Sequence, residues 1–131
     1  MSKWTHVAAI VRIDSVTRAT GVNEDWLGYF GKECLWNSSR ECRYDAQYNP
    51  DDYLPMGSEE SLRSSIWTDP DTHNVAAYTV MIFGDLRDYA SPQTIIDWFK
   101  KKINGIPMVR QAVITVATEG IKTIVWNKEE D

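Results

Sequence analysis

The sequence lacks the short motifs by which many enzyme classes are recognised. It has no G-x-x-x-x-G-K-[ST] loop, no G-x-G-x-x-G, no H-E-x-x-H, no G-x-S-x-G and no C-x-x-C. Histidine, the commonest general base, occurs only as His6 and His73, and no motif pairs either of them with a partner. We therefore expect no catalytic residues, no bound metal and no cofactor, and a binding protein is a better hypothesis than an enzyme.

Cysteine is equally scarce, with Cys34 and Cys42 as the only two. The sequence starts without a signal peptide, and no apolar run is long enough to span a membrane. These absences predict a cytoplasmic protein with two reduced thiols, and a Cys34–Cys42 disulfide remains the alternative. Two cysteines without a nearby histidine also make a poor zinc site.

The balance of charge is acidic, with 19 Asp and Glu against 14 Lys and Arg and a formal net charge of −5. A net negative protein repels the phosphate backbone, which argues against non-specific nucleic-acid binding but leaves room for a local basic patch. The chain of 131 residues is the right size for one domain. Its six Trp and six Tyr are many for that length, and they suit either a core or a binding surface.

The stretch from Val75 to Val116 predicts a strand, a helix and a second strand. Val75–Phe83 is rich in β-branched and aromatic residues and apolar on both faces, which predicts a central strand with its exit at Gly84. Ser91-Pro92 is typical of a helix start, with Ser91 as the cap, and Gly105 is typical of a helix end. The apolar stripe of this helix is Ile95, Ile96, Phe99 and Ile103.

The rest of the chain adds further elements in order. A short helix is expected to start at Asn23 and to end near Cys34. Alternation of apolar and polar residues predicts the other strands at Trp4–Asp14, Ser61–Thr68, Val109–Ala117 and Ile121–Trp126. The order β-α-β-β-α-β with an extra C-terminal strand resembles the ferredoxin-like split βαβ pattern of the α+β class. That pattern places strands one and three centrally and both helices on one face.

Residues 36–60 form a long irregular insertion in this pattern. The segment has few aliphatic residues, many turn formers and acids, and three tyrosines, Tyr44, Tyr48 and Tyr53. Connections of this length are usually functional or disordered, and the tyrosines favour order. We expect an acidic, aromatic loop with one short helical turn that binds a protein partner, or a lid over a sheet edge.

Arginines on the predicted strands form the second candidate site. Guanidinium groups can hold a phosphate while a base stacks on an aromatic ring, so a small anionic ligand such as a nucleotide is the second candidate partner. The alternative is that these arginines form surface ion pairs with Asp14, Asp85 or Glu119. The residues concerned are Arg12, Arg63, Arg87 and Arg110, with Trp67 and Tyr78 as the aromatic neighbours.

Two carboxylates, Asp85 and Asp88, follow the predicted end of the strand at Gly84. Such a pair can bind a metal or act as acid and base, but aspartate is also common in turns. A small metal-dependent hydrolase or nuclease is therefore the alternative function.

Stretches such as WTHVAAIVRID, YLPMGSEESLRSSIW and AAYTVMIFGDLRD resemble those of small proteins of phages and prophages of Gram-positive bacteria. The resemblance brings no family of known activity with it. It implies a phage protein in the cytoplasm of the host, where it inhibits an immune system by binding a host nuclease complex or by sequestering a nucleotide signal. We expect a homo-oligomer that binds without catalysis, and a structural phage component is a further alternative.

Overall fold

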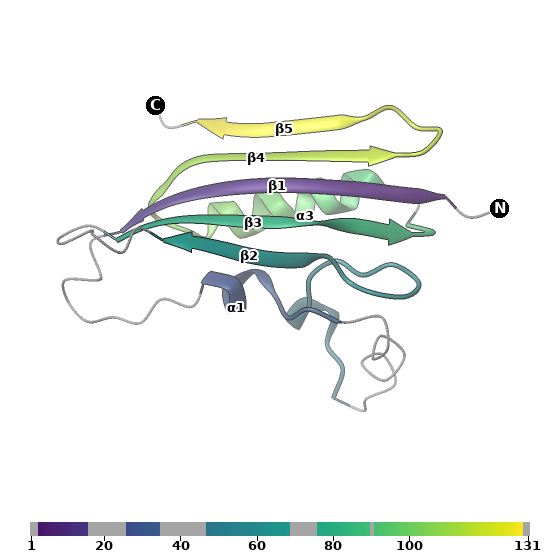
Figure 1. Cartoon of the computed structure of the whole chain (residues 1–131), viewed down its shortest axis with the longest axis horizontal. Helices are drawn as coiled ribbons and strands as arrows, with labels where there is room; N and C mark the ends of the chain where they lie inside the picture. Colours follow the sequence, from purple (N-terminus) through teal and green to yellow (C-terminus); the bar gives the residue numbers. More distant parts are fainter. Residues whose placement is uncertain (1–2, 16–25, 35–46, 69–75, 90, 130–131) are drawn as a thin grey trace.

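One antiparallel sheet of five strands carries the fold (Figure 1). The computed structural model describes residues 3–15, 26–34, 47–68, 76–89 and 91–129. Across the sheet the strands run in the order β2-β3-β1-β4-β5, and every neighbouring pair is antiparallel. This α+β arrangement is compatible with the expected ferredoxin-like fold. The strands are β1 (Trp4–Ser15), β2 (Arg63–Thr68), β3 (Ala76–Arg87), β4 (Val109–Thr118) and β5 (Ile124–Glu129).

The two faces of the sheet differ because side chains alternate along each strand. On β1 the residues Val7, Val11 and Ile13 are buried, whereas Ile10 between them is 47% exposed. We call the face that carries the buried side chains the inner face and the opposite one the outer face. The predicted alternation of β1 is therefore confirmed.

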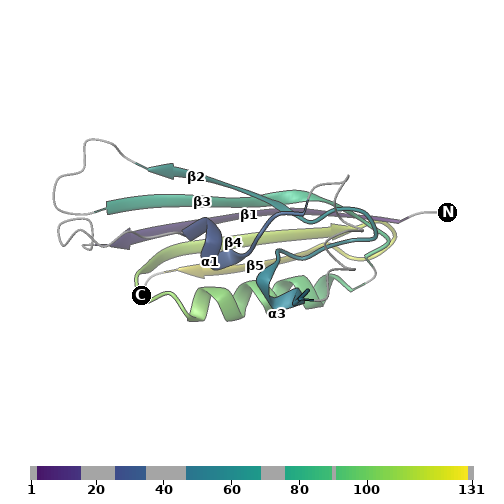
Figure 2. The same ribbon diagram turned by 90° about the horizontal axis from the view of Figure 1, so that it is seen from below.

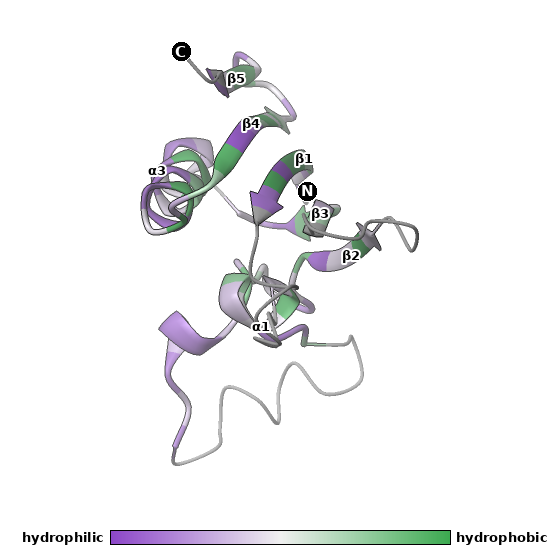
Figure 3. Cartoon of the chain, turned by 90° about the vertical axis from the view of Figure 1, so that its left-hand side faces the viewer, coloured by the Kyte–Doolittle hydropathy of each residue, from purple (hydrophilic) through white to green (hydrophobic). Residues whose placement is uncertain are grey.

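Both helices lie over the inner face, as the sequence predicted (Figures 2 and 3). Helix α3 (Pro92–Asn104) packs on β4 and β5, and the short helix α1 (Trp26–Phe30) lies beside β2. Phe30 and Leu54 join the buried cluster beneath the sheet, so the described part of the long loop also covers this side. Within the described ranges, no helix is long and apolar enough to cross a membrane.

Helix α3 follows its sequence signals except at the cap. Pro92 occupies the first turn, Gly105 is the C-cap, and the predicted apolar stripe is buried. Ser91 does occupy the N-cap position, but its side chain makes no capping bond. Its hydroxyl bonds the Thr94 hydroxyl at 2.8 Å instead, while the Thr94 amide donates to the Ser91 carbonyl at 3.2 Å. The predicted role of the Ser91 side chain was therefore wrong.

The predicted exit of β3 at Gly84 was also wrong. Gly84 has a φ of 145°, which L side chains rarely adopt, and this lets the strand continue to Arg87. As a result Asp85 lies within the strand, opposite His6 of β1. β3 is internal as predicted, but its outer side chains Met81 and Phe83 are exposed. β3 and β4 are not neighbours, because β1 lies between them.

Three other elements, α1, β2 and β5, have boundaries that differ from the predicted ones. Helix α1 ends at Phe30, short of Cys34, because Gly31 turns the chain with a φ of 141°. β2 begins at Arg63, after the buried Ser61 and Leu62, and β5 begins at Ile124. Cys34 is buried, and Cys42 and the predicted cap Asn23 lie outside the described residues.

The free edge of β2 has a side-chain partner. The amide of Ser64 points away from β3 and donates to the Glu33 carboxylate at 2.7 Å. Glu33 follows α1 and thereby ties that segment to the edge of the sheet.

Candidate functional site

Two of the predicted arginines meet at one end of the outer face. Arg12 and Arg110 bind the two oxygens of one carboxylate, Asp14, at 2.9 and 3.1 Å. Partial burial alone would raise the pKa of Asp14, but the hydrogen bonds and positive charges of Arg12 and then Arg110 outweigh it and lower that pKa below its usual value. Two of the strand arginines therefore form ion pairs, as the alternative interpretation held for Asp14.

Replacing Asp14 with asparagine is expected to lower stability by less than about 1 kcal/mol at neutral pH, because the pairs are partly exposed. A carboxyl whose pKa is lowered by folding stabilises the protein above its unfolded pKa of about 4, and this contribution disappears as pH falls through the folded value. Urea unfolding at pH 7 and at pH 3 checks this. The difference between wild type and Asp14→Asn should be smaller at pH 3 than at pH 7, and an undiminished difference would contradict the assignment.

The other two arginines lie elsewhere. Arg63, on the edge strand β2, binds Glu60 at 3.2 Å. Arg87, at the opposite end of the sheet from Arg12, binds Glu59 at 2.6 Å and approaches Asp88 at 3.8 Å. The four arginines therefore do not converge on one anion site.

The two predicted aromatic neighbours, Trp67 and Tyr78, lie on opposite faces of the sheet. Trp67 lies on the outer face, in the same row as Arg12 with Thr79 of β3 between them. Tyr78 lies on the inner face, where its ring meets Trp26 at a centroid distance of 6.4 Å. The structure thus does not assemble the predicted group of arginines around both rings, and Tyr44 lies outside the described residues.

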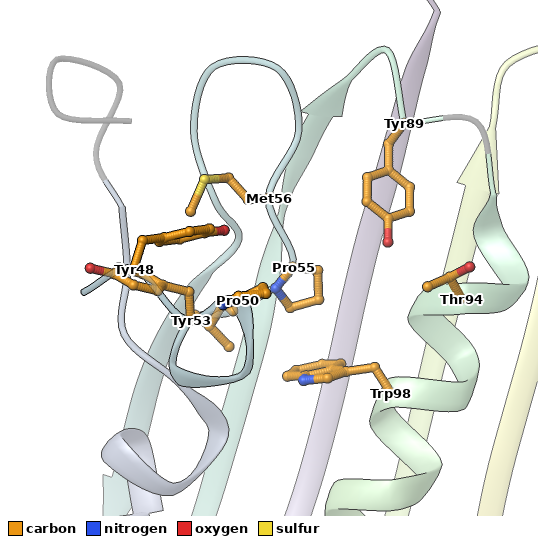
Figure 4. Close-up of a pocket in the computed structure, with 9 residues that line it drawn as sticks. Tyr48, Pro50, Tyr53, Pro55, Met56, Tyr89, Thr94 and Trp98 are labelled. Carbon is orange, nitrogen blue, oxygen red and sulfur yellow. The ribbon is translucent and has the colours of Figure 1, made fainter. Parts of the chain in front are cut away.

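Tyr48 and Tyr53 lie next to each other on the inner side of the sheet, which also carries the helices. Their rings lie 5.4 Å apart and are tilted by 38°. They belong to a cleft of about 290 Å³ between the loop and α3, which we call the aromatic cleft (Figure 4). Its lining residues are Tyr48, Pro50, Tyr53, Leu54, Pro55, Met56, Tyr89, Thr94 and Trp98.

Local structure holds the loop side of the cleft in place. Pro50–Asp52 form one turn of 3-10 helix, named η3, and the Asn49 side chain caps it by accepting a bond from the Asp51 amide at 3.1 Å. This is the short helical turn that the sequence predicted. Backbone bonds on both sides of Tyr53 then join the loop to Lys32, from the Lys32 amide to Asp52 at 2.9 Å and from the Leu54 amide to Lys32 at 3.0 Å.

The polar groups of the cleft are neutral donors and acceptors. Burial raises the pKa of Tyr89, so its phenol stays protonated at physiological pH. In Figure 4 the Tyr89 hydroxyl points into the space beside Thr94, and the Trp98 ring faces the prolines of the loop. None of the lining residues is basic. The cleft therefore suits an apolar or aromatic group better than a phosphate.

Sequence reasoning missed the helix side of this cleft. Trp98 is on the helix and Tyr89 precedes it, whereas the prolines belong to the loop, so only tertiary packing brings them together. The run YNPDDYLPM, in which two tyrosines alternate with prolines, was the one signal available.

The sequence also did not predict the contact between His6 and Asp85, because it depends on the register of β1 with β3. His6 Nδ1 lies 2.7 Å from Asp85 Oδ1 on the outer face, and both side chains are about half exposed. Asp85 therefore binds a histidine, while Asp88 exchanges bonds with the backbone of Lys3. Over the part of the chain that is described, no group of three or more metal-ligating side chains gathers around these carboxylates or elsewhere.

Comparison of the chain with protein-family models, with curated proteins and with solved structures gave no match.

Proposed function

We propose that the chain is a non-enzymatic binding protein that holds a segment of a protein partner in the aromatic cleft. The observation that carries this proposal is the gathering of Tyr48, Tyr53, Tyr89 and Trp98 around one open cleft. Rigid aromatic rings supply large contact areas at little entropic cost, which is why they dominate the energetics of protein interfaces. The resemblance to phage and prophage proteins extends the proposal to an inhibitor of a bacterial immune system that binds a host nuclease complex.

A protein partner fits the geometry better than a sequestered nucleotide. A nucleotide needs cations near its phosphates, and the cleft lining offers none. The arginines of the outer face are bound to carboxylates and spread over its two ends. Any phosphate would have to displace those carboxylates.

The chemistry of the cleft further defines the segment that would enter. Grooves lined by Tyr, Trp and Pro are suited to extended, proline-containing peptides, which lose little entropy on binding. We therefore infer that the partner segment is extended and contains proline or other apolar residues.

We also assign the fold to the ferredoxin-like class with β5 as an addition. The order β4-β1-β3-β2 with both helices on one face supports this assignment. A sheet of that kind leaves one face and the loops at its ends available for binding.

The test is inhibition of immunity by wild type and by a cleft variant. In a Gram-positive host that restricts a phage through an immune nuclease, expression of the wild-type protein is expected to restore phage plating. The double variant Tyr48→Ala/Tyr53→Ala should lose this effect. Its affinity for the purified nuclease complex, measured by calorimetry, should fall by about 30-fold or more, because buried aromatic contacts dominate such interfaces.

Met108→Ala is the matched control, since it removes an apolar side chain that is 45% exposed, does not line the cleft and lies outside the paired rows of the sheet. It should leave plating and affinity unchanged, and thermal melts should show both variants folded. Equal loss of function in the two variants would contradict the role of the cleft. Saturable binding of a cyclic or linear oligonucleotide that is abolished by Arg12→Ala would replace this proposal with nucleotide sequestration.

A further inference from the structure

The outer face of the sheet carries a continuous exposed apolar surface. Ile10 of β1, Met81 of β3 and Val113 of β4 form one row across the strands, with Phe83 and Trp67 in the rows on either side. The exposed fractions are 47% for Ile10, 45% for Met81, 39% for Phe83 and 53% for Trp67. Large contiguous patches of this kind mark interfaces on soluble proteins, and no described helix or loop covers this one (Figure 2).

The composition of this surface is that of an interface core. Trp, Phe, Met and Arg are enriched at the centres of protein interfaces, whereas Lys and Glu are depleted. The paired rows through Met81 and through Phe83 contain no Lys or Glu, and the row of Trp67 and Arg12 contains one, Glu129, at its β5 end.

The size of the face matches what a stable dimer needs. Five strands at about 4.8 Å spacing give a width of about 24 Å. The 12 residues of β1 span about 40 Å and the 6 residues of β2 about 20 Å, so the mean length is about 30 Å. The resulting area of about 700 Å² is close to the roughly 800 Å² that each partner contributes to a standard interface.

The charges at the two ends select one orientation. At one end of the face Arg12 and Arg110 share the single carboxylate of Asp14. The other end carries Asp85 beside His6, and its one arginine, Arg87, lies between two carboxylates, Glu59 and Asp88, so acids predominate there. A two-fold axis across the strands, along the row of Ile10 and Met81, brings the arginine end of one copy to the Asp85 end of the other. It places this row against itself and the Phe83 row against the Trp67 row. An axis along the strands would instead place arginines against arginines.

We propose that the outer face binds a second copy of this chain, face to face and with opposed strand directions. The contact is isologous and therefore closes as a dimer. The aromatic cleft lies on the helical side, so both clefts of the dimer face outward. The proposal does not depend on what the cleft binds.

Sedimentation equilibrium of the full chain tests the dimer. A mass near twice 15.0 kDa is expected, falling to 15.0 kDa on dilution. Met81→Glu should weaken the dimer by at least about 100-fold, because it would bury a carboxylate among apolar side chains. Met108→Glu is the matched control, since Met108 is also 45% exposed but lies outside the paired rows of the sheet. It should remain dimeric, and circular dichroism should show both variants folded.

A charge exchange tests the orientation. Asp85→Lys should weaken association by about tenfold, because it places a cation opposite the arginine end. Adding Arg110→Glu to that variant should restore the affinity to within about threefold of wild type. A double variant as weak as Asp85→Lys would overturn the opposed orientation.

Other outcomes overturn the proposal itself. A monomer at millimolar concentration, a Met81→Glu variant that still dimerises, or a Met108→Glu variant that does not would remove the outer face as the self-contact. Open-ended assemblies would replace the closed dimer with a structural lattice. A host protein that binds monomeric wild type but not Met81→Glu would assign this face to that partner.

Discussion

An unfolding free energy lower by about 3–5 kcal/mol is expected when Phe99 is replaced with alanine. Phe99 lies on α3, is fully buried, and meets the ring of Trp126 on β5 edge-on at 5.8 Å. Truncation removes these contacts and leaves a cavity, because helix and sheet can only partly close around it. For a chain of this length the melting temperature should fall by about 10–20 °C. Urea unfolding and calorimetry measure both quantities.

Phe83→Ala is the matched control for this change. It removes the same side chain, but Phe83 is 39% exposed on the outer face of β3. At concentrations where the chain is monomeric, its cost should be well under half that of Phe99→Ala, since less apolar surface returns to water. Similar losses in the two variants would mean that the helix contributes no more to the core than the open face does.

Gly31→Ala is expected to destabilise the protein by more than the roughly 1–3 kcal/mol of backbone strain alone. Gly31 has a φ of 141°, and a Cβ there would lie 2.7 Å from the backbone of Tyr53 and of Leu54. Backbone atoms cannot move aside as a side chain can, so the loop would have to separate from α1. The bonds between Lys32 and the loop should loosen with it, and the aromatic cleft should lose its shape.

Gly84→Ala separates conformational strain from crowding. Gly84 has nearly the same φ, 145°, but its Cβ would meet the flexible Leu62 side chain at 3.3 Å. Gly31→Ala should therefore cost clearly more than Gly84→Ala in denaturant unfolding. Hydrogen exchange at the Leu54 amide, which bonds Lys32, should accelerate only in the Gly31 variant. Equal losses of unfolding free energy in the two variants would show that the close approach of the loop to Gly31 does not add to the effect of the substitution.

Local patterns predicted most of the fold. The alternation of β1 and the stripe of Ile95, Ile96, Phe99 and Ile103 on α3 are periodic in the sequence because burial is periodic in the structure. The end of β3 was missed because glycine is a turn signal from sequence alone, whereas Gly84 adopts a φ of 145° inside the strand, which continues to Arg87. Ser91 was assigned a capping bond because sequence cannot show that Thr94 competes for its hydroxyl.

The candidate sites were harder to predict, because they depend on register and on packing between distant segments. Sequence placed Arg12 and Arg110 on strands, but only the register of β1 with β4 shows that they share Asp14. It also identified Tyr48 and Tyr53, yet their neighbour Trp98 comes from a helix much later in the chain, and only tertiary packing brings it beside them.

The hydrogen bond from the Ser64 amide to Glu33 opposes aggregation of the protein at high concentration. An exposed edge strand is a template on which another chain can add a strand, and such addition leads to aggregation. β2 is an edge strand, and the Glu33 carboxylate occupies one of its outward amides with a negative charge. A strand that approached this edge would have to displace a charge-assisted bond and accept a nearby anion. Glu33 therefore disfavours the addition of a strand at the β2 edge, while the outer face stays available for binding.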